Sequence, residues 1–180
     1  HWPYGVIVLP DERVLVSNQG DDTLAVLSSD YTTQAILPVA DSPRAIAVSS
    51  DGSSAFVTHL ISRRETGTTS VVDLETLVVD ATVPLVDDPG PDTASSGRGV
   101  PNILSAAAIE PSGARVWIGG LKANTSAGLY RRGAPVAPEN MIRGLMSSLA
   151  SADGAEVLER RIDTNDADSV SALCFSASGR

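Results

Sequence analysis

Five polar side chains in the second half of the sequence have the chemistry of a binding site: Arg98, Asn102, Lys122, Asn140 and Arg143. Guanidinium and ammonium groups donate charge-assisted hydrogen bonds, and asparagine amides both donate and accept. Such a set could bind a ligand or a protein partner. It could equally tie a long insertion back to the domain beneath it, and the sequence alone leaves both interpretations open.

Three aspartates lie close together in one loop-forming stretch: Asp87, Asp88 and Asp92. Carboxylate oxygens are the ligands that calcium prefers, which makes this stretch the place to consider a metal ion. The spacing is not the alternating pattern of a defined calcium loop, and prolines interrupt it. We therefore expect a solvated acidic loop and no metal.

No catalytic motif is recognisable elsewhere. The two histidines are His1 and His59, no nucleophile elbow surrounds a serine, and no glycine-rich phosphate loop precedes a helix. Cys174, the single cysteine, stands within an apolar run and is typical of a buried structural thiol. We expect no catalytic residue and no cofactor within this chain, although enzymatic activity of a larger protein stays open.

The elements that must position these side chains follow a repeat. In residues 41–57 a proline leads into a short apolar strand, an Asp-Gly turn follows, and a second strand comes after it. The same hairpin recurs after Pro3, Ser105 and Ser171. From Pro3 to Pro43 is 40 residues, the length of one four-stranded propeller blade.

We predict an all-β chain, a segment of a β-propeller with four-stranded antiparallel blades. It contains about three blades and the first strand of a fourth, and looks like an excerpt of a larger propeller. The predicted units are blade 1 at about residues 3–40, blade 2 at 41–84, a loop at 85–99, blade 3 at 100–163 with an insertion at 119–138, and the start of blade 4 at 169–180.

Alternating and β-branched patterns predict the strands within each unit. Residues 156–161 alone could pass for a helix, but the repeat register favours a strand there. The predicted strands are 5–9, 13–17, 23–27 and 33–37, then 44–49, 54–59, 69–74 and 77–83, then 104–109, 115–118, 140–149 and 155–162. The side chains expected in the core are Val6, Val8, Ile46, Val48, Phe56, Val72, Ala107, Ile109, Trp117 and Leu173.

Composition limits the possible partners. The chain has 180 residues, is 42% hydrophobic and carries a formal net charge of −9. Phosphate backbones are bound by positive patches, so a nucleic-acid partner is not expected. No apolar run approaches the roughly 20 residues that a transmembrane helix needs.

The repeats resemble the YVTN β-propeller family over residues 3–84. The tetrapeptide that names the family corresponds to Val-Leu-Val-Ser-Asn at 14–18 and to Ala-Phe-Val-Thr-His at 55–59. Beyond them, the stretches at 98–102, 120–124 and 139–143 are similar to a subgroup in which a secreted propeller is joined to a dihaem domain resembling cytochrome c peroxidase.

This resemblance implies a bacterial protein of the periplasm or cell surface. Its expected function is non-catalytic binding or scaffolding through protein–protein contact, and the partner is another protein or the remaining blades of the same protein. The alternative is the propeller part of a haem-containing oxidoreductase. In that case, the haem would belong to an attached c-type cytochrome domain or to a partner.

The long irregular stretches indicate where function is concentrated. Residues 84–99 and 119–138 are rich in glycine, proline and polar residues, and long loops of this kind are usually functional or disordered. We predict that both insertions pack together on one face of the propeller and form its partner-contacting surface. Arg98 and Arg143 should lie close to that junction.

Overall fold

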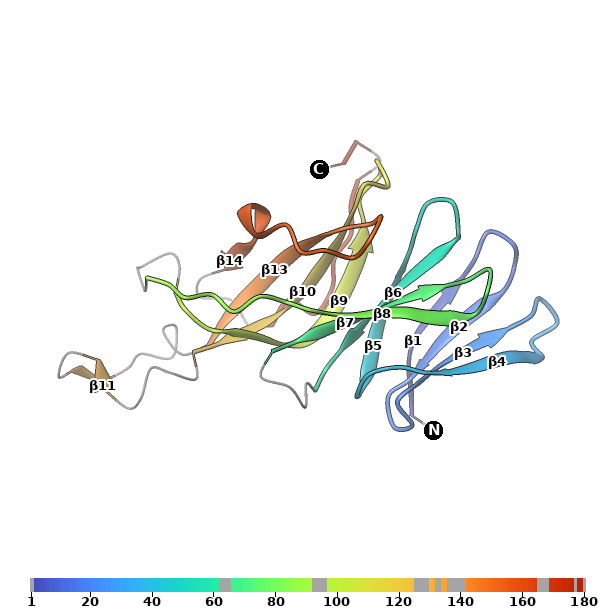
Figure 1. Cartoon of the computed structure of the whole chain (residues 1–180), viewed down its shortest axis with the longest axis horizontal. Helices are drawn as coiled ribbons and strands as arrows, with labels where there is room; N and C mark the ends of the chain where they lie inside the picture. The colour runs from blue at the N-terminus through green and yellow to red at the C-terminus, as the bar shows by residue number, and fades with distance from the viewer. Residues whose placement is uncertain are drawn as a thin grey trace.

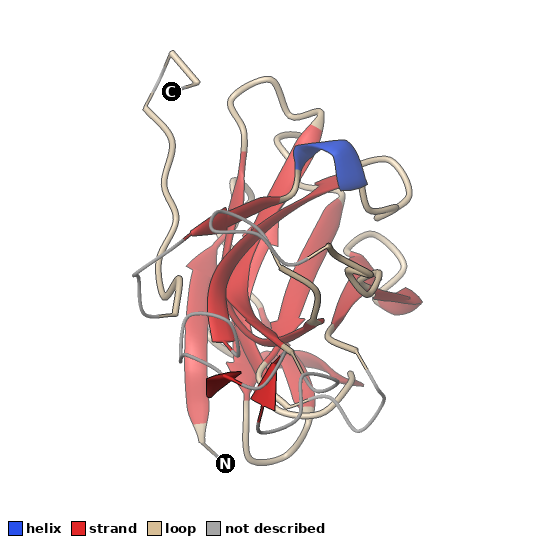
Figure 2. Ribbon diagram, turned by 90° about the vertical axis from the view of Figure 1, so that its left-hand side faces the viewer, coloured by secondary structure: helices blue, strands red, loops and turns tan. Residues whose placement is uncertain are grey.

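Strands dominate the structure of this chain. The computed structural model describes residues 2–61, 66–91, 97–124, 130–131, 134–135, 142–164, 169–176 and 178–179. Within these residues, three four-stranded antiparallel sheets stand side by side (Figure 1). The one short helix of the described residues lies at the margin of the third sheet (Figure 2). None of the described helices is long and apolar enough to span a membrane.

The first two sheets follow the chain without a crossover. The first contains β1 (Pro3–Val8), β2 (Val14–Asn18), β3 (Thr23–Leu27) and β4 (Thr33–Pro38). The second contains β5 (Pro43–Val48), β6 (Ser54–His59), β7 (Thr68–Asp73) and β8 (Val78–Pro84). All eight strands lie within two residues of the predicted ranges, because each is bounded by local turn residues.

The first two strands of the third sheet are longer than predicted. It contains β9 (Val100–Ile109), β10 (Arg115–Ala123), β13 (Ile142–Ala150) and β14 (Ile162–Thr164). A two-stranded hairpin of β11 (Tyr130–Arg131) and β12 (Ala134–Pro135) is inserted between β10 and β13. The extra length arises because β9 pairs with β10 as far as Val100 opposite Ala123.

The strand predicted at residues 155–162 is wrong. A 3-10 turn, η1 (Leu158–Arg160), lies in the middle of this stretch, and the outer strand begins only at Ile162. Its turn is closed by Arg160 N–H donating to the Val157 carbonyl at 3.0 Å. The local sequence pattern favoured a helix and was closer to the observed turn than the strand that the repeat register favoured.

Two apolar cores lie between the sheets. Between the first and second sheets the buried side chains include Leu15, Leu24, Val26, Val57 and Val72. Between the second and third they include Phe56, Leu104, Val116, Ile118 and Leu149. Four-stranded sheets stacked face to face in this way are β-propeller blades. The predicted fold class is therefore confirmed, and the sheets are called blades 1, 2 and 3 below.

The core prediction holds for Phe56 and Val72, which are fully buried, and fails for two valines. Val6 is 69% exposed and Val8 66% exposed, because they lie on a face of blade 1 that neither of the other two described blades covers. The remaining predicted core residues are half-buried: Ile46, Val48, Ala107, Ile109, Trp117 and Leu173.

Residues 169–176 lie against blade 3 without pairing as a strand. Ser105 Oγ donates to the Val170 carbonyl at 3.1 Å. Gly179 N–H then closes a turn on the Ser176 carbonyl at 2.9 Å, as Gly52 N–H does on Ser49 at 2.9 Å. This segment therefore follows the path of an inner blade strand. Cys174 within it is exposed, contrary to expectation, because no neighbouring strand covers it among the described residues.

Candidate functional site

Lys122 joins two segments that are distant in sequence. It lies near the end of β10, and its side chain is completely buried. Its Nζ donates to Oδ2 of Asp88 at 2.6 Å and to Oδ2 of Asp163 at 2.7 Å. A buried ammonium is costly unless it is paired and hydrogen-bonded. Here two carboxylates share it, one from the loop between blades 2 and 3 and one from β14.

The backbone of the same loop passes close to β10. Asp88 and Gly99 exchange two hydrogen bonds, at 2.9 and 3.0 Å, which close the loop at its base. A Cβ on Gly99 would lie 2.8 Å from Cγ of Lys122 and 2.8 Å from the Ala123 carbonyl oxygen. Glycine therefore allows the loop to pass directly over the lysine. Gly97 N–H adds a hydrogen bond to Oδ2 of Asp163 at 3.2 Å.

The electrostatics of the site keep Asp88 ionised. Burial alone would raise the pKa of Asp88. Hydrogen bonds from Lys122 and the Gly90 N–H, with the positive charges of Lys122 and Arg161, outweigh burial and hold that pKa below its usual range. The carboxylate is therefore charged at neutral pH and pairs with the ammonium.

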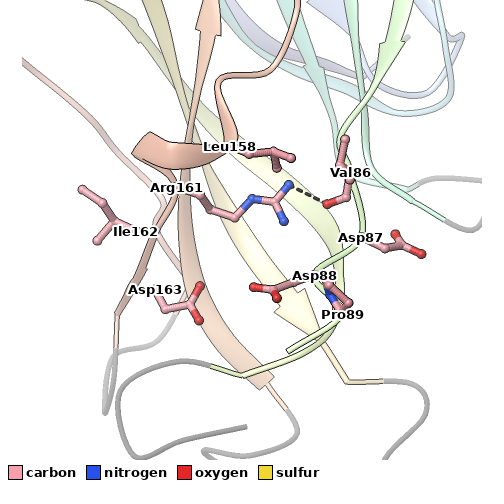
Figure 3. Close-up of a pocket in the computed structure, with 8 residues that line it drawn as sticks. All are labelled: Val86, Asp87, Asp88, Pro89, Leu158, Arg161, Ile162 and Asp163. Atoms are coloured by element: carbon pink, nitrogen blue, oxygen red, sulfur yellow. Dashed lines mark hydrogen bonds between the residues drawn. The ribbon is translucent and has the colours of Figure 1, made fainter. Parts of the chain in front are cut away.

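A second buried ion pair fastens the start of the loop. Nε of Arg161 donates to Oε1 of Glu156 at 3.0 Å. Its Nη2 donates to the Val86 carbonyl at 2.5 Å, the bond that Figure 3 draws as a dashed line. Val86 N–H donates to Oε2 of Glu156 at 2.6 Å. The Ser147 hydroxyl also donates to Glu156. Val86 is thus held by one residue on each side of η1.

Between the loop and blade 3 lies a pocket of about 810 Å³. Figure 3 shows its lining: Val86, Asp87, Asp88, Pro89, Leu158, Arg161, Ile162 and Asp163. The apolar walls include exposed parts of Val86, Leu158 and Ile162. Arg161 is neutralised by Glu156, and Lys122 is shared by two carboxylates. With Asp87 also at the surface, the pocket carries excess negative charge.

Four of the five predicted binding residues lie in the described part of the chain, and two of these four lie next to each other. Lys122 and Arg143 are opposite each other in the β10–β13 register, and both are buried. Arg98 is exposed and lines a smaller cavity of about 260 Å³ beside Asp87 and Asp88. Asn102 is half-buried in β9, and its Oδ1 accepts the Ile103 N–H at 2.8 Å.

Two predicted residues, Asn140 and Asp92, lie outside the described residues. Among the part of the chain that is described, no three His, Cys, Asp or Glu side chains are grouped to hold a metal. Asp88 instead serves as a partner of Lys122.

Three residues of the site were missed by sequence reasoning: Glu156, Arg161 and Asp163. Glu156 and Arg161 fell in a stretch assigned to a strand, and Asp163 was only the last residue assigned to blade 3. The only sequence signal was the cluster of opposite charges at residues 156–163.

No protein-family model matches this chain, and no curated protein sequence matches it either. Several solved structures are similar to this chain. Hydrazine synthase from Kuenenia stuttgartiensis is similar over 99% of this chain and 40% of that chain, with a TM-score of 0.68 and 17% identity. The WD40 repeats of RRP9 are similar over 94% of this chain and 41% of that chain, with a TM-score of 0.62 and 12% identity.

A protein of unknown function from Bacteroides caccae is similar over 92% of this chain and 50% of that chain, with a TM-score of 0.56 and 11% identity. At such low identities the likeness shows the fold alone, which is that of β-propeller blades. The chain spans 40% to 50% of the length of these three proteins.

Proposed function

We propose that this chain is a binding or scaffold β-propeller segment that contacts a protein partner at the pocket between blade 3 and the loop that joins blades 2 and 3. The observation that carries this proposal is the pocket beside Lys122, whose walls are fixed by two buried ion pairs. A surface that is already ordered loses less conformational entropy on binding. Loops held by a rigid scaffold are also where binding residues concentrate.

The chemistry of the pocket suits a positively charged side chain with an apolar stem. Asp87 is exposed at the rim, and Val86, Leu158 and Ile162 are 48%, 44% and 43% exposed around it. Lysine and arginine bury their methylene groups on apolar surface while the charged group stays near carboxylates. The partner therefore presents a basic residue flanked by aliphatic ones.

The test uses two synthetic peptides, one alternating leucine with arginine and one alternating leucine with glutamate. Calorimetric titration should show binding of the arginine peptide alone. Asp87→Asn and Leu158→Ser should each weaken it, and added salt should weaken it further. Asp80→Asn, an exposed change on β8 away from the pocket, is the matched control. Equal binding of both peptides, or equal effects of Asp87→Asn and Asp80→Asn, would contradict the proposal.

The proposed location is the bacterial periplasm or cell surface. It rests on the similarity of residues 98–102, 120–124 and 139–143 to propellers that are secreted. Fractionation of cells that produce the protein, followed by immunodetection, tests it. Recovery in the cytoplasmic fraction alone would contradict it.

The second candidate is the propeller part of a haem-containing oxidoreductase related to cytochrome c peroxidase. The same three stretches favour it, and one similar fold belongs to an enzyme by name, hydrazine synthase. Haem would then reside in an attached c-type cytochrome domain or in a partner. A Soret absorbance band in the purified longer protein would support this candidate, and its absence there would remove it.

A further inference from the structure

The bridge at the base of the loop between blades 2 and 3 has two faces. Asp88 and Gly99 form this antiparallel bridge. Figure 3 shows Asp87 and Asp88 on opposite sides of the loop, with Asp88 directed toward Asp163. Because side chains alternate between the two faces of an extended chain, the sequence neighbours of Asp88 and Gly99 share the face that is turned away from Lys122.

These neighbours line the cavity of about 260 Å³, which we call the second pocket: Asp87, Pro89, Arg98 and Val100. Asp87 and Arg98 are exposed, whereas Asn124, which also lines the second pocket, is only 6% exposed. Pockets that hold a whole drug-sized ligand have volumes of roughly 300–1,000 Å³. The second pocket is smaller and therefore suits a single side chain.

The charges in the second pocket balance. Among the described residues, the charged side chains that line it are Asp87, Asp88 and Arg98. The Asp88 carboxylate is paired with Lys122 on the other side of the loop, which leaves one carboxylate and one guanidinium to face the cavity. Asp87 and Arg98 are diagonal neighbours across the bridge, a relation that separates two residues by about 7–8 Å. One small polar group can contact both.

We propose that the second pocket binds a primary carboxamide, the side chain of a glutamine or an asparagine. This inference rests on the proposed function, because the residue belongs to the same partner that occupies the pocket beside Lys122. A carboxamide both donates and accepts hydrogen bonds. Its NH₂ group donates to the Asp87 carboxylate, and its carbonyl accepts from Arg98. Arg98 already has a contact within the chain, and a guanidinium has enough N–H donors for a further partner.

The two opposite charges make the second pocket selective. A glutamate in the same place brings its carboxylate against Asp87, and a lysine brings its ammonium against Arg98. Like charges brought together at an interface disfavour the wrong partner. Methionine is close to glutamine in size but offers neither an amide donor nor a carbonyl. Glutamine should therefore bind more tightly than glutamate, lysine or methionine.

The test extends the peptide that alternates leucine with arginine. Each leucine in turn is replaced by glutamine, glutamate, lysine or methionine, and binding is measured by calorimetric titration. At one position the glutamine peptide should bind at least about tenfold more tightly than the methionine peptide. Arg98→Gln should remove this advantage. Arg160→Gln, the same change at an exposed arginine outside both pockets, is the matched control and should retain it.

The same variants should also gain a new preference, which loss of folding cannot produce. In Arg98→Gln the second pocket keeps only the charge of Asp87, so the lysine peptide should become the tightest of the four. In Asp87→Asn it keeps only the charge of Arg98, so the glutamate peptide should become the tightest.

The outcomes separate this inference from the proposed function. Leu158 lines only the pocket beside Lys122. If Leu158→Ser weakens every peptide but glutamine and methionine peptides bind equally at every position, the proposed function holds and the carboxamide site is overturned. If none of the peptides binds, both are overturned. A preference of the unaltered protein for glutamate or lysine over glutamine would also overturn the inference.

Discussion

At the residue scale, one buried ammonium group organises the candidate site. The sequence singled out Lys122 as a polar residue at the root of an insertion. It did not reveal the partners, because Asp88 and Asp163 are 34 and 41 residues away along the chain. Contacts of that range depend on how blades stack, and no local pattern of residue types encodes them.

Replacement of Lys122 by methionine should destabilise the chain strongly. It leaves Asp88 and Asp163 as neighbouring carboxylates without the ammonium group that joins them, and the Asp163 side chain is only 6% exposed. Breaking a buried pair in this way typically costs about 3–5 kcal/mol, measurable by urea denaturation. Adding Asp88→Asn and Asp163→Asn to the methionine variant should restore part of the loss. A loss below about 1 kcal/mol, as for a surface pair, would show that the lysine is not a structural centre.

The burial of His59 should make the free energy of unfolding depend on pH. His59 is fully buried, and its Nε2 lies 2.9 Å from Ser70 Oγ. Burial lowers the pKa of His59 from 6.5 to about 4, against smaller opposing contributions from backbone hydrogen bonds of Asp41 and Ala40 and the charge of Asp22. As the pH falls below 6.5, the unfolded chain therefore binds the proton first.

The contribution of His59 is fully present above pH 6.5 and lost as the pH falls to about 4. The corresponding decrease in the free energy of unfolding is about 3 kcal/mol. Urea denaturation at a series of pH values measures it. In His59→Gln the decrease between these pH values should be largely absent, and an identical pH profile for both proteins would refute the assignment.

At the element scale, local patterns predicted the strands of blades 1 and 2 well. Each hairpin there is bounded by turn residues close in sequence, so the pattern contains the necessary information. The outer strand of blade 3 was mispredicted because Glu156 has long-range partners, including the Val86 N–H 70 residues away. That contact fixes a turn where the repeat alone favours a strand.

Close approach between inner strands makes Gly5 a sensitive position. A Cβ on Gly5 would lie 2.3 Å from the Arg44 carbonyl oxygen and 2.8 Å from Ser17 Oγ. Gly5→Ala therefore forces β1 and β5 apart, and we expect a loss of about 1–3 kcal/mol in thermal or urea unfolding. Gly20→Ala is the matched control, since its Cβ would meet only ordinary contacts at 3.4 Å from Trp2. Equal stability of the two variants would argue against tight packing of blades 1 and 2.

At the scale of the whole molecule, burial depends on which blades are adjacent. The sequence placed Val6 and Val8 in the core with Phe56, because all three occupy strands of the same repeat. Only the arrangement of blades separates them, with Phe56 between blades 2 and 3 and the two valines on an open face. A periodic pattern identifies the faces of a strand but not which face has a neighbour.

Phe56→Ala should therefore be more damaging than Trp117→Ala. Phe56 is fully buried between two blades, whereas Trp117 is half-buried at the far side of blade 3. Truncating a buried phenylalanine costs about 3–5 kcal/mol, and the tryptophan change should cost clearly less. Chemical denaturation of both variants measures the difference, and the reverse order would mean that the contact between blades 2 and 3 is wrongly described.

The central claim is that the pocket beside Lys122 is a partner-contacting surface. It is tested most directly by a photo-reactive amino acid placed at Asp87 in cells that produce the protein natively, with the same amino acid at Asp80 as control. Both positions are exposed, and only Asp87 lines the pocket. We predict one discrete protein adduct from position 87 that is absent from position 80. No adduct at position 87, or the same adducts at both positions, would contradict the claim.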